Sequence, residues 1–221
     1  MVLRAGRNLL PFSREWQLAD QLKLIERSML AALSPGEGGQ ALGAEARLVV
    51  SPYMEIAFGG YNPDSSEEDE KQTPDWLFQG IVRPIVDGLD LSGTIYRSLA
   101  EGYWAGSAGF CLVREELDAV GSVEGEILFN GSKVVRQRGW KLMGSYGVIR
   151  EHLVLPLTEF VARYATVHAL DSDDEKDQVA LGVNFYVGDP ARRNRVGFNY
   201  VWDRDTDNTI RRALVQLQVS L

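Results

Sequence analysis

Apolar and polar residues alternate with a period of two along the last part of the chain. The odd positions from 179 to 187 are all apolar: four carry valine or leucine, and position 185 carries phenylalanine. Every even position from 196 to 202 is valine or aromatic, and the odd positions from 213 to 221 are again apolar. Only Val201 and Leu214 break the polar sides. This period predicts β-strands that separate two unlike environments.

The same alternation, less regular, recurs upstream. It predicts further strands at about 2–9, 44–50, 54–59, 76–86, 89–99, 104–115, 121–132, 139–149 and 155–169. The whole chain therefore holds about twelve strands. Residues 14–33 are the exception, because Leu18, Leu22, Ile25 and Met29 have helical spacing. We expect one short helix or an inward loop there, which would narrow a pore in a barrel or plug the core of a soluble protein.

Strand length and the composition of the polar sides distinguish a membrane barrel from a sandwich. The strands approach ten residues, whereas sandwich strands are typically about five or six. The polar sides carry many small or charged residues, which suits a watery interior. We interpret residues 1–221 as a single antiparallel transmembrane β-barrel with its apolar side outwards. The alternatives are a soluble β-sandwich or barrel that binds carbohydrate or another small ligand, and a non-conducting barrel that anchors a partner.

Acidic connections fall on alternate turns of the predicted meander. The runs near 62–75, 170–177 and 204–209 are rich in aspartate and glutamate. If the C-terminus is periplasmic, they lie outside together with 10–41, 99–104 and 132–138. The segment 62–75 is then an acidic extracellular loop, and 12–41 is a candidate inward or constriction segment.

Composition excludes several functional classes. The formal net charge of −8 and the absence of a basic stripe disfavour a nucleic-acid partner. Uncharged stretches are too short for a spanning helix. The start lacks the apolar core of a signal peptide, so an export signal would have to be removed or lie upstream. The single cysteine, Cys111, can form no internal disulfide. With two histidines, no P-loop and no Cys/His cluster, we expect no enzyme, cofactor or metal.

Several runs resemble the phosphate-selective porin family. The run GRNLLPFSREWQLADQLKLIERSMLAALSPG resembles the family segment in which a strand leads into a Pro-Phe-Ser-Arg-Glu turn. TEFVARYATV resembles a family strand, and LGVNFYVGDPARRNRVGFNYVWDRD with ALVQLQVSL resembles its closing hairpins. The resemblance implies a trimeric, sixteen-stranded channel for small solutes in the bacterial outer membrane. About four strands of that pattern are missing, the chain is acidic overall, and Leu221 replaces the usual terminal aromatic residue.

For a channel, the polar positions between lipid-facing residues set ion selectivity. By parity the pore-lining candidates are Glu45, Arg47, Gln79, Arg83, Glu124, Glu126, Lys141, Glu159, Arg163 and Arg212. The constriction candidates are Arg14, Lys23, Glu26 and Arg27. The expected assembly signal is the apolar alternation Val215, Leu217, Val219 and Leu221. The expected partners are outer-membrane lipid, small solutes or ions, and two further copies in a homotrimer.

Overall fold

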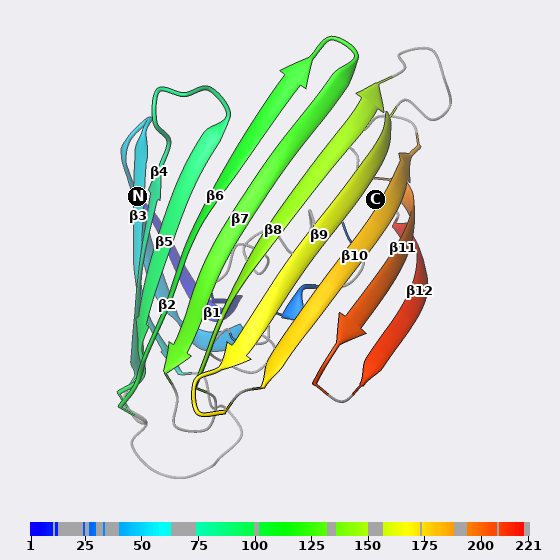
Figure 1. The fold of residues 1–221 in the computed structure, drawn as a ribbon. Coiled ribbons are helices and arrows are strands. Elements are labelled where there is room, and N and C mark those ends of the chain that lie inside the picture. The colour runs from blue at the N-terminus through cyan, green and yellow to red at the C-terminus, as the bar shows by residue number, and fades with distance from the viewer. Residues whose placement is uncertain are drawn as a thin grey trace.

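The fold is taken from a computed structural model of the 221-residue chain. It describes residues 1–10, 12, 24, 27–29, 33, 40–62, 74–99, 102–131, 136–149, 157–172, 174–187, 194–206 and 208–218. These residues form one curled antiparallel sheet, shown in Figure 1. None of the described residues belongs to a helix with the length and hydropathy needed to cross a bilayer.

Twelve strands follow one another in the sheet in the order in which they occur in the sequence. They are β1 (Val2–Leu9), β2 (Gln40–Ser51), β3 (Met54–Asn62), β4 (Asp75–Val82), β5 (Leu89–Arg97), β6 (Trp104–Glu116), β7 (Ala119–Gly131), β8 (Arg136–Ile149), β9 (Leu157–Ala169), β10 (Glu175–Tyr186), β11 (Arg195–Arg204) and β12 (Thr209–Gln218). Each strand pairs with its neighbours in the chain. No pairing between described residues joins β1 to β12.

The strands confirm the prediction of about twelve strands, with small differences at their ends. The clearest difference is at β4, which ends at Val82 although the pattern predicted a strand as far as 86. Pro84 follows closely and has no N–H to donate to a ladder, so pairing stops there. The helix predicted over 14–33 lies mostly outside the described residues.

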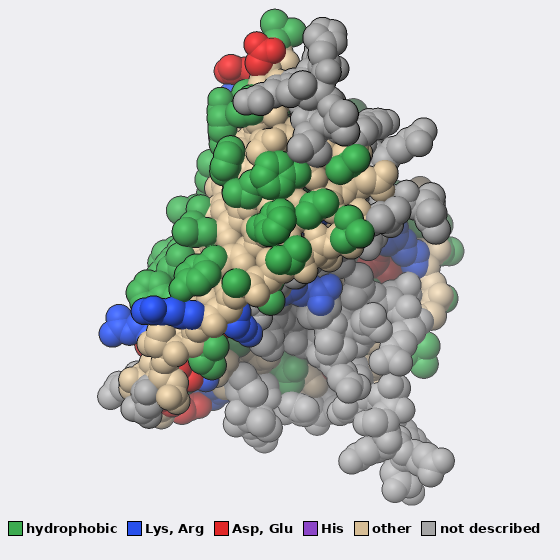
Figure 2. Space-filling model, turned by 90° about the vertical axis from the view of Figure 1, so that its right-hand side faces the viewer, with side chains coloured by type: hydrophobic (Ala, Val, Ile, Leu, Met, Phe, Trp, Pro, Cys, Tyr) green, Lys and Arg blue, Asp and Glu red, His purple; other side chains and the backbone are tan. Residues whose placement is uncertain are grey.

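The sheet is inverted relative to a soluble protein. Large apolar side chains such as Ile127, Phe160 and Leu181 are exposed on its outer face, while charged residues such as Lys141 and Arg163 are buried on its inner face. Figure 2 shows the hydrophobic side chains gathered on the outside of the sheet. This is the arrangement that the alternation predicted, and a sealed apolar core would have contradicted it.

Alternate connections place the strand ends on two rims. The lower rim in Figure 1 holds the ends of β1, β3, β5, β7, β9 and β11 and the starts of the strands that follow them, and the upper rim holds the other strand ends. The strands that flank the three acidic runs therefore have those ends on the same rim. Connection length separates the rims less well, because 187–194 on the upper rim is longer than 205–208. Most of the predicted loop 62–75 lies outside the described residues.

Tryptophans mark the outer face near the lower rim. Trp76, Trp104, Trp140 and Trp202 all point outwards and are exposed. They are four of the chain's five tryptophans, and the fifth, Trp16, lies outside the described residues. Such rings are enriched where hydrocarbon meets water. The row therefore marks one border of the apolar outer band.

Candidate functional site: the inner face of the sheet

All ten predicted pore-lining residues lie on the inner face. The register places nine of them on the side of their strands that carries the buried polar residues. Arg83 follows the end of β4 and reaches the same side through its ion pairs with Glu55 and Asp90. Glu45, Gln79, Glu124, Glu126, Lys141, Glu159 and Arg163 are buried, while Arg47, Arg83 and Arg212 keep part of their surface exposed. We call this face the inner wall; it carries charged and polar side chains, several of them in ion pairs, beside two apolar clusters.

The first charge network crosses β2 to β5. Arg47 contacts both Glu45 at 3.3 Å and Glu55 at 2.9 Å. Arg83 in turn lies 3.6 Å from both Glu55 and Asp90. Tyr61 donates a hydrogen bond of 2.8 Å from its hydroxyl to Glu45 Oε2. Acids and bases alternate along this network, so the wall here presents both signs of charge.

The second network joins β7 to β8. Lys141 Nζ lies 3.0 Å from Glu126 Oε2, and the two side chains are only 2% and 3% exposed. These residues face each other directly in the strand register. A buried pair of this kind must be matched closely, because each charge has lost its water. Glu124 lies on the same face of β7 and is also buried.

The third network runs from β9 to β12. Arg163 donates from Nη2 to Gln178 Oε1 at 2.7 Å, and Gln178 Nε2 donates to Asp203 Oδ1 at 2.9 Å. Arg212 completes the chain by donating to the other oxygen of Asp203. The sequence analysis did not select Gln178 or Asp203. Both stand on the polar sides of their alternating runs, and that signal could have identified them.

Glu159 forms a smaller cluster near the upper end of β9. Its Oε2 accepts a hydrogen bond of 3.3 Å from Asn184 and one of 2.9 Å from Tyr186. The carboxylate is buried, so these donors replace part of its hydration. The inner wall therefore has fixed polar groups from one rim towards the other.

Residues between β1 and β2 lie against this wall. Leu10, Phe12 and Leu33 are buried with Tyr96 and other inward residues in one apolar cluster. Ser107 Oγ donates to the Phe12 carbonyl at 2.5 Å, and Asn130 Nδ2 donates to the Leu33 carbonyl at 3.0 Å. The described part of this segment is therefore inside the curl of the sheet.

Leu24 explains the two breaks in the polar alternation. It packs in a second inner cluster with Met143, Val161, Ala180 and Val201, against which Leu214 also packs. An apolar residue from the segment between β1 and β2 thus meets Val201 and Leu214. The sequence pattern showed the two exceptions but could not show their partner.

A hollow of about 390 Å³ opens on the inner face at the lower rim. Arg27, Lys176, Asp205 and Arg212 are among the residues that line it. Lys176 Nζ lies 2.8 Å from Asp205 Oδ2. The hydrogen bond from Lys176 lowers the pKa of Asp205 below its ordinary value, so this carboxylate stays ionised at neutral pH. No cluster of three or more metal-binding side chains occurs in the described ranges.

Some predicted site residues can be placed only in part. Of the constriction candidates, Arg27 lies beside the hollow, while Arg14, Lys23 and Glu26 lie outside the described residues. Of the assembly signal, Val215 and Leu217 point outwards from β12 and are strongly exposed. Val219 and Leu221 lie outside the described residues.

A curled antiparallel sheet with an apolar outside and a charged inside defines the fold of an outer-membrane β-barrel. The outer membrane channel DcaP of Acinetobacter baumannii matches 97% of this chain and 70% of its own, with a TM-score of 0.64 and 10% sequence identity. Pseudomonas aeruginosa OccK9 (OpdG) matches 97% of this chain and 73% of its own, with a TM-score of 0.48 and 10% identity. No protein-family model matches the sequence, and no curated protein is similar to it.

Proposed function

We propose that the chain is a porin of the bacterial outer membrane, through which small hydrophilic solutes or ions diffuse passively. The observation that carries this proposal is the inversion of the sheet. A face that exposes Phe160 and Leu181 suits hydrocarbon, and a face that buries paired charges suits a water-filled path. The fold shared with DcaP supports the same assignment.

The primary test is insertion and conductance. We expect the full chain, refolded into lipid vesicles, to need detergent for extraction and to migrate differently on gels before and after boiling. In a planar bilayer it should give stable conductance steps. A protein that keeps its β-structure as a soluble monomer in plain buffer would contradict the proposal, and insertion without conductance would favour a barrel that anchors a partner.

Ion selectivity should respond to the charges of the inner wall. Arg83 is part of the first charge network and its side chain is 41% exposed, so permeating ions can reach it. Replacing it with glutamine leaves Glu55 and Asp90 without their shared cation. We expect Arg83→Gln to shift the reversal potential under a KCl gradient towards cation selectivity.

Arg138 provides the matched control for this charge change. It is an exposed arginine on the outer face of β8, opposite Phe129 in the register. Arg138→Gln removes the same charge without touching the inner wall. An equal shift in both variants would mean that the net charge of the protein, and not the charge on the inner wall, sets the reversal potential.

The segment between β1 and β2 is proposed to constrict the pore. A Cβ atom added at Gly182 would lie 2.8 Å from Leu24 Cδ2 and 3.1 Å from Asn199 Nδ2. We expect Gly182→Val to displace Leu24 and to increase the single-channel conductance. Gly80 is the control, because a Cβ atom there meets nothing within 4 Å. If Gly182→Val and Gly80→Val both conduct like the original protein, Leu24 does not hold a constriction.

Trimeric assembly is implied by the family resemblance, and it predicts three chains per particle in detergent. Phosphate selectivity is not expected of this chain, because its formal net charge is −8. The first charge network holds three acids and two bases, so we expect phosphate not to block the chloride current at low concentration.

A further inference from the structure

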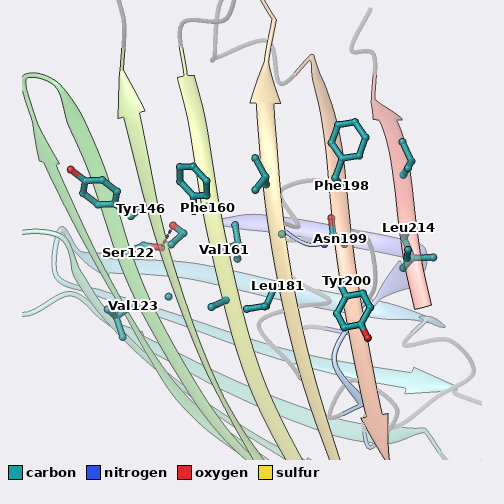
Figure 3. A pocket seen from close by; sticks show the side chains of 17 residues that line it. Ser122, Val123, Tyr146, Phe160, Val161, Leu181, Phe198, Asn199, Tyr200 and Leu214 are labelled. Carbon is teal, nitrogen blue, oxygen red and sulfur yellow. Dashed lines mark hydrogen bonds between the residues drawn. The ribbon is translucent and has the colours of Figure 1, made fainter. Parts of the chain in front are cut away.

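A hollow of about 810 Å³ lies on the outer face of β7 to β12. One side of it is a row of the register on the outer face, in which Gly144, Ala162 and Ala213 are small, while Leu181 and Tyr200 are large and exposed. The next row towards the upper rim carries Tyr146, Phe160 and Phe198, which form one wall. Figure 3 shows these three rings on the same side of the hollow. We call this feature the outer trough.

The outer trough has the length of a lipid chain. Its row crosses from Val123 on β7 to Ala213 on β12, which is five strand spacings. At about 4.8 Å per spacing the trough is roughly 24 Å long. Its lining is almost wholly apolar apart from a few hydroxyl and amide groups. The length and the apolar lining suit an extended hydrocarbon chain placed between this row, from which Leu181 and Tyr200 project, and the wall of rings.

A positive group lies at the β12 end of the outer trough. Arg211 faces Trp202 across β11 and β12, two residues from Ala213 along the same face. Arg204 follows Trp202 on the outer face of β11, although it also borders the hollow at the lower rim. Both arginines are exposed, and in the described part of the chain no carboxylate is within ion-pair distance of either.

Two outward carboxylates, Glu175 and Asp177, lie on β10 near the lower rim, and each has a partner on β9. Glu175 Oε1 accepts a hydrogen bond of 3.4 Å from the Thr166 hydroxyl. Asp177 stands opposite Arg204 in the register, and its Oδ1 accepts a hydrogen bond of 2.6 Å from the Tyr164 hydroxyl. The two arginines thus border the apolar band at the level of Trp202, where the interface of a bilayer would place anionic head groups. A second copy of this chain would have to bring carboxylates to them, whereas a phospholipid brings a phosphate by itself.

We propose that the outer trough and the arginine pair Arg204 and Arg211 form one binding site for an anionic phospholipid. The phosphate-bearing head group contacts the arginines beside Trp202, and an acyl chain lies in the outer trough, between the wall of rings and the row that contains Gly144, Ala162 and Ala213. This site rests on the proposed membrane location, but it requires more than that location, since a bare lipid-facing surface would show no preference between head groups.

The test compares two lipids with identical acyl chains. The full chain is refolded into vesicles that contain equal amounts of dimyristoylphosphatidylglycerol and dimyristoylphosphatidylcholine, extracted in detergent, and examined by native mass spectrometry. We expect it to retain the anionic phosphatidylglycerol. Each arginine should contribute about a fivefold preference, so R204Q/R211Q should weaken it by roughly thirty-fold.

Matched variants separate the head-group contact from the trough. R114Q removes an exposed outward arginine near the upper rim and should leave the preference unchanged. G144L/A162F fills the trough and should abolish retention with both arginines intact; a Cβ atom at Gly144 has room, since the nearest atom is 3.9 Å away. G80L adds the same bulk to the outer face of β4 and should retain the lipid.

Three results would overturn the site. Equal retention of the two lipids would show that the arginines do not select a head group. Competition by inorganic phosphate would show a phosphate site that needs no lipid, and a dimer abolished by G144L/A162F would show that a second copy occupies the trough. Conductance is measured on the same preparation. A chain that inserts and conducts but fails the lipid tests contradicts the lipid site and leaves the porin assignment standing.

Discussion

Replacing Leu181 with arginine should destabilise the protein in a bilayer by about 2 to 4 kcal/mol. Leu181 lies on the outer face in the middle of β10, and its side chain is 52% exposed in the absence of lipid. In a membrane that exposed surface meets hydrocarbon, where a guanidinium group loses its water. The free energy of unfolding in lipid vesicles, measured by urea titration of tryptophan fluorescence, checks this expectation.

The same substitution distinguishes the porin from a soluble binding module. On the surface of a soluble protein, a half-exposed leucine is replaced by arginine at a cost within about 0.5 kcal/mol. Thr209 serves as the control position, since it is an exposed outward residue at the lower rim, opposite Arg204. Thr209→Arg should be nearly neutral in both settings. If Leu181→Arg is also neutral in vesicles, the apolar face does not contact lipid.

Replacing Lys141 with methionine should cost about 3 to 5 kcal/mol of unfolding free energy. The change removes one member of the buried pair and leaves Glu126 charged, with its side chain only 3% exposed. The penalty comes from burying a carboxylate that has lost this cation more than from the lost attraction itself. The double variant Glu126→Gln with Lys141→Met should therefore recover much of the loss.

The exposed pair Lys176 and Asp205 is the matched control. Its atoms are closer, at 2.8 Å against 3.0 Å, but its side chains are 51% and 42% exposed. Lys176→Met should cost about 0 to 1 kcal/mol, because water already solvates both charges. Equal costs at Lys141 and Lys176 would mean that the inner wall is as well hydrated as the rim.

The alternation in the sequence predicted the strands well because each strand has one apolar face and one polar face over its whole length. A period of two fixes which face each side chain takes, so parity alone placed residues as far apart as Glu45 and Arg212 on the same inner wall. The ends of strands were predicted less well, since they depend on local features such as Pro84.

The sequence could not show which residues the side chains of the inner wall contact. Parity shows that Arg163 points inwards, but its bond to Gln178 depends on the register between β9 and β10. The contacts of Leu24 and Leu33 depend on how one irregular segment lies within the curl. The pattern marked Trp140 and Trp202 as candidates for an interfacial girdle, but it could not show that Trp76 and Trp104 lie near the same rim, because that depends on how the strands are aligned.

The segment between β1 and β2 has a consequence for the order of folding. The sheet consists of neighbouring hairpins, so its ladders can form from contacts that are close in the chain. By contrast, Ser107 bonds to Phe12 and Asn130 to Leu33 across 95 and 97 residues. Contacts of such long range form slowly. We therefore expect docking of this segment to be a late kinetic step, distinct from growth of the strands, and a channel caught before that step would have all its strands but an unfilled interior.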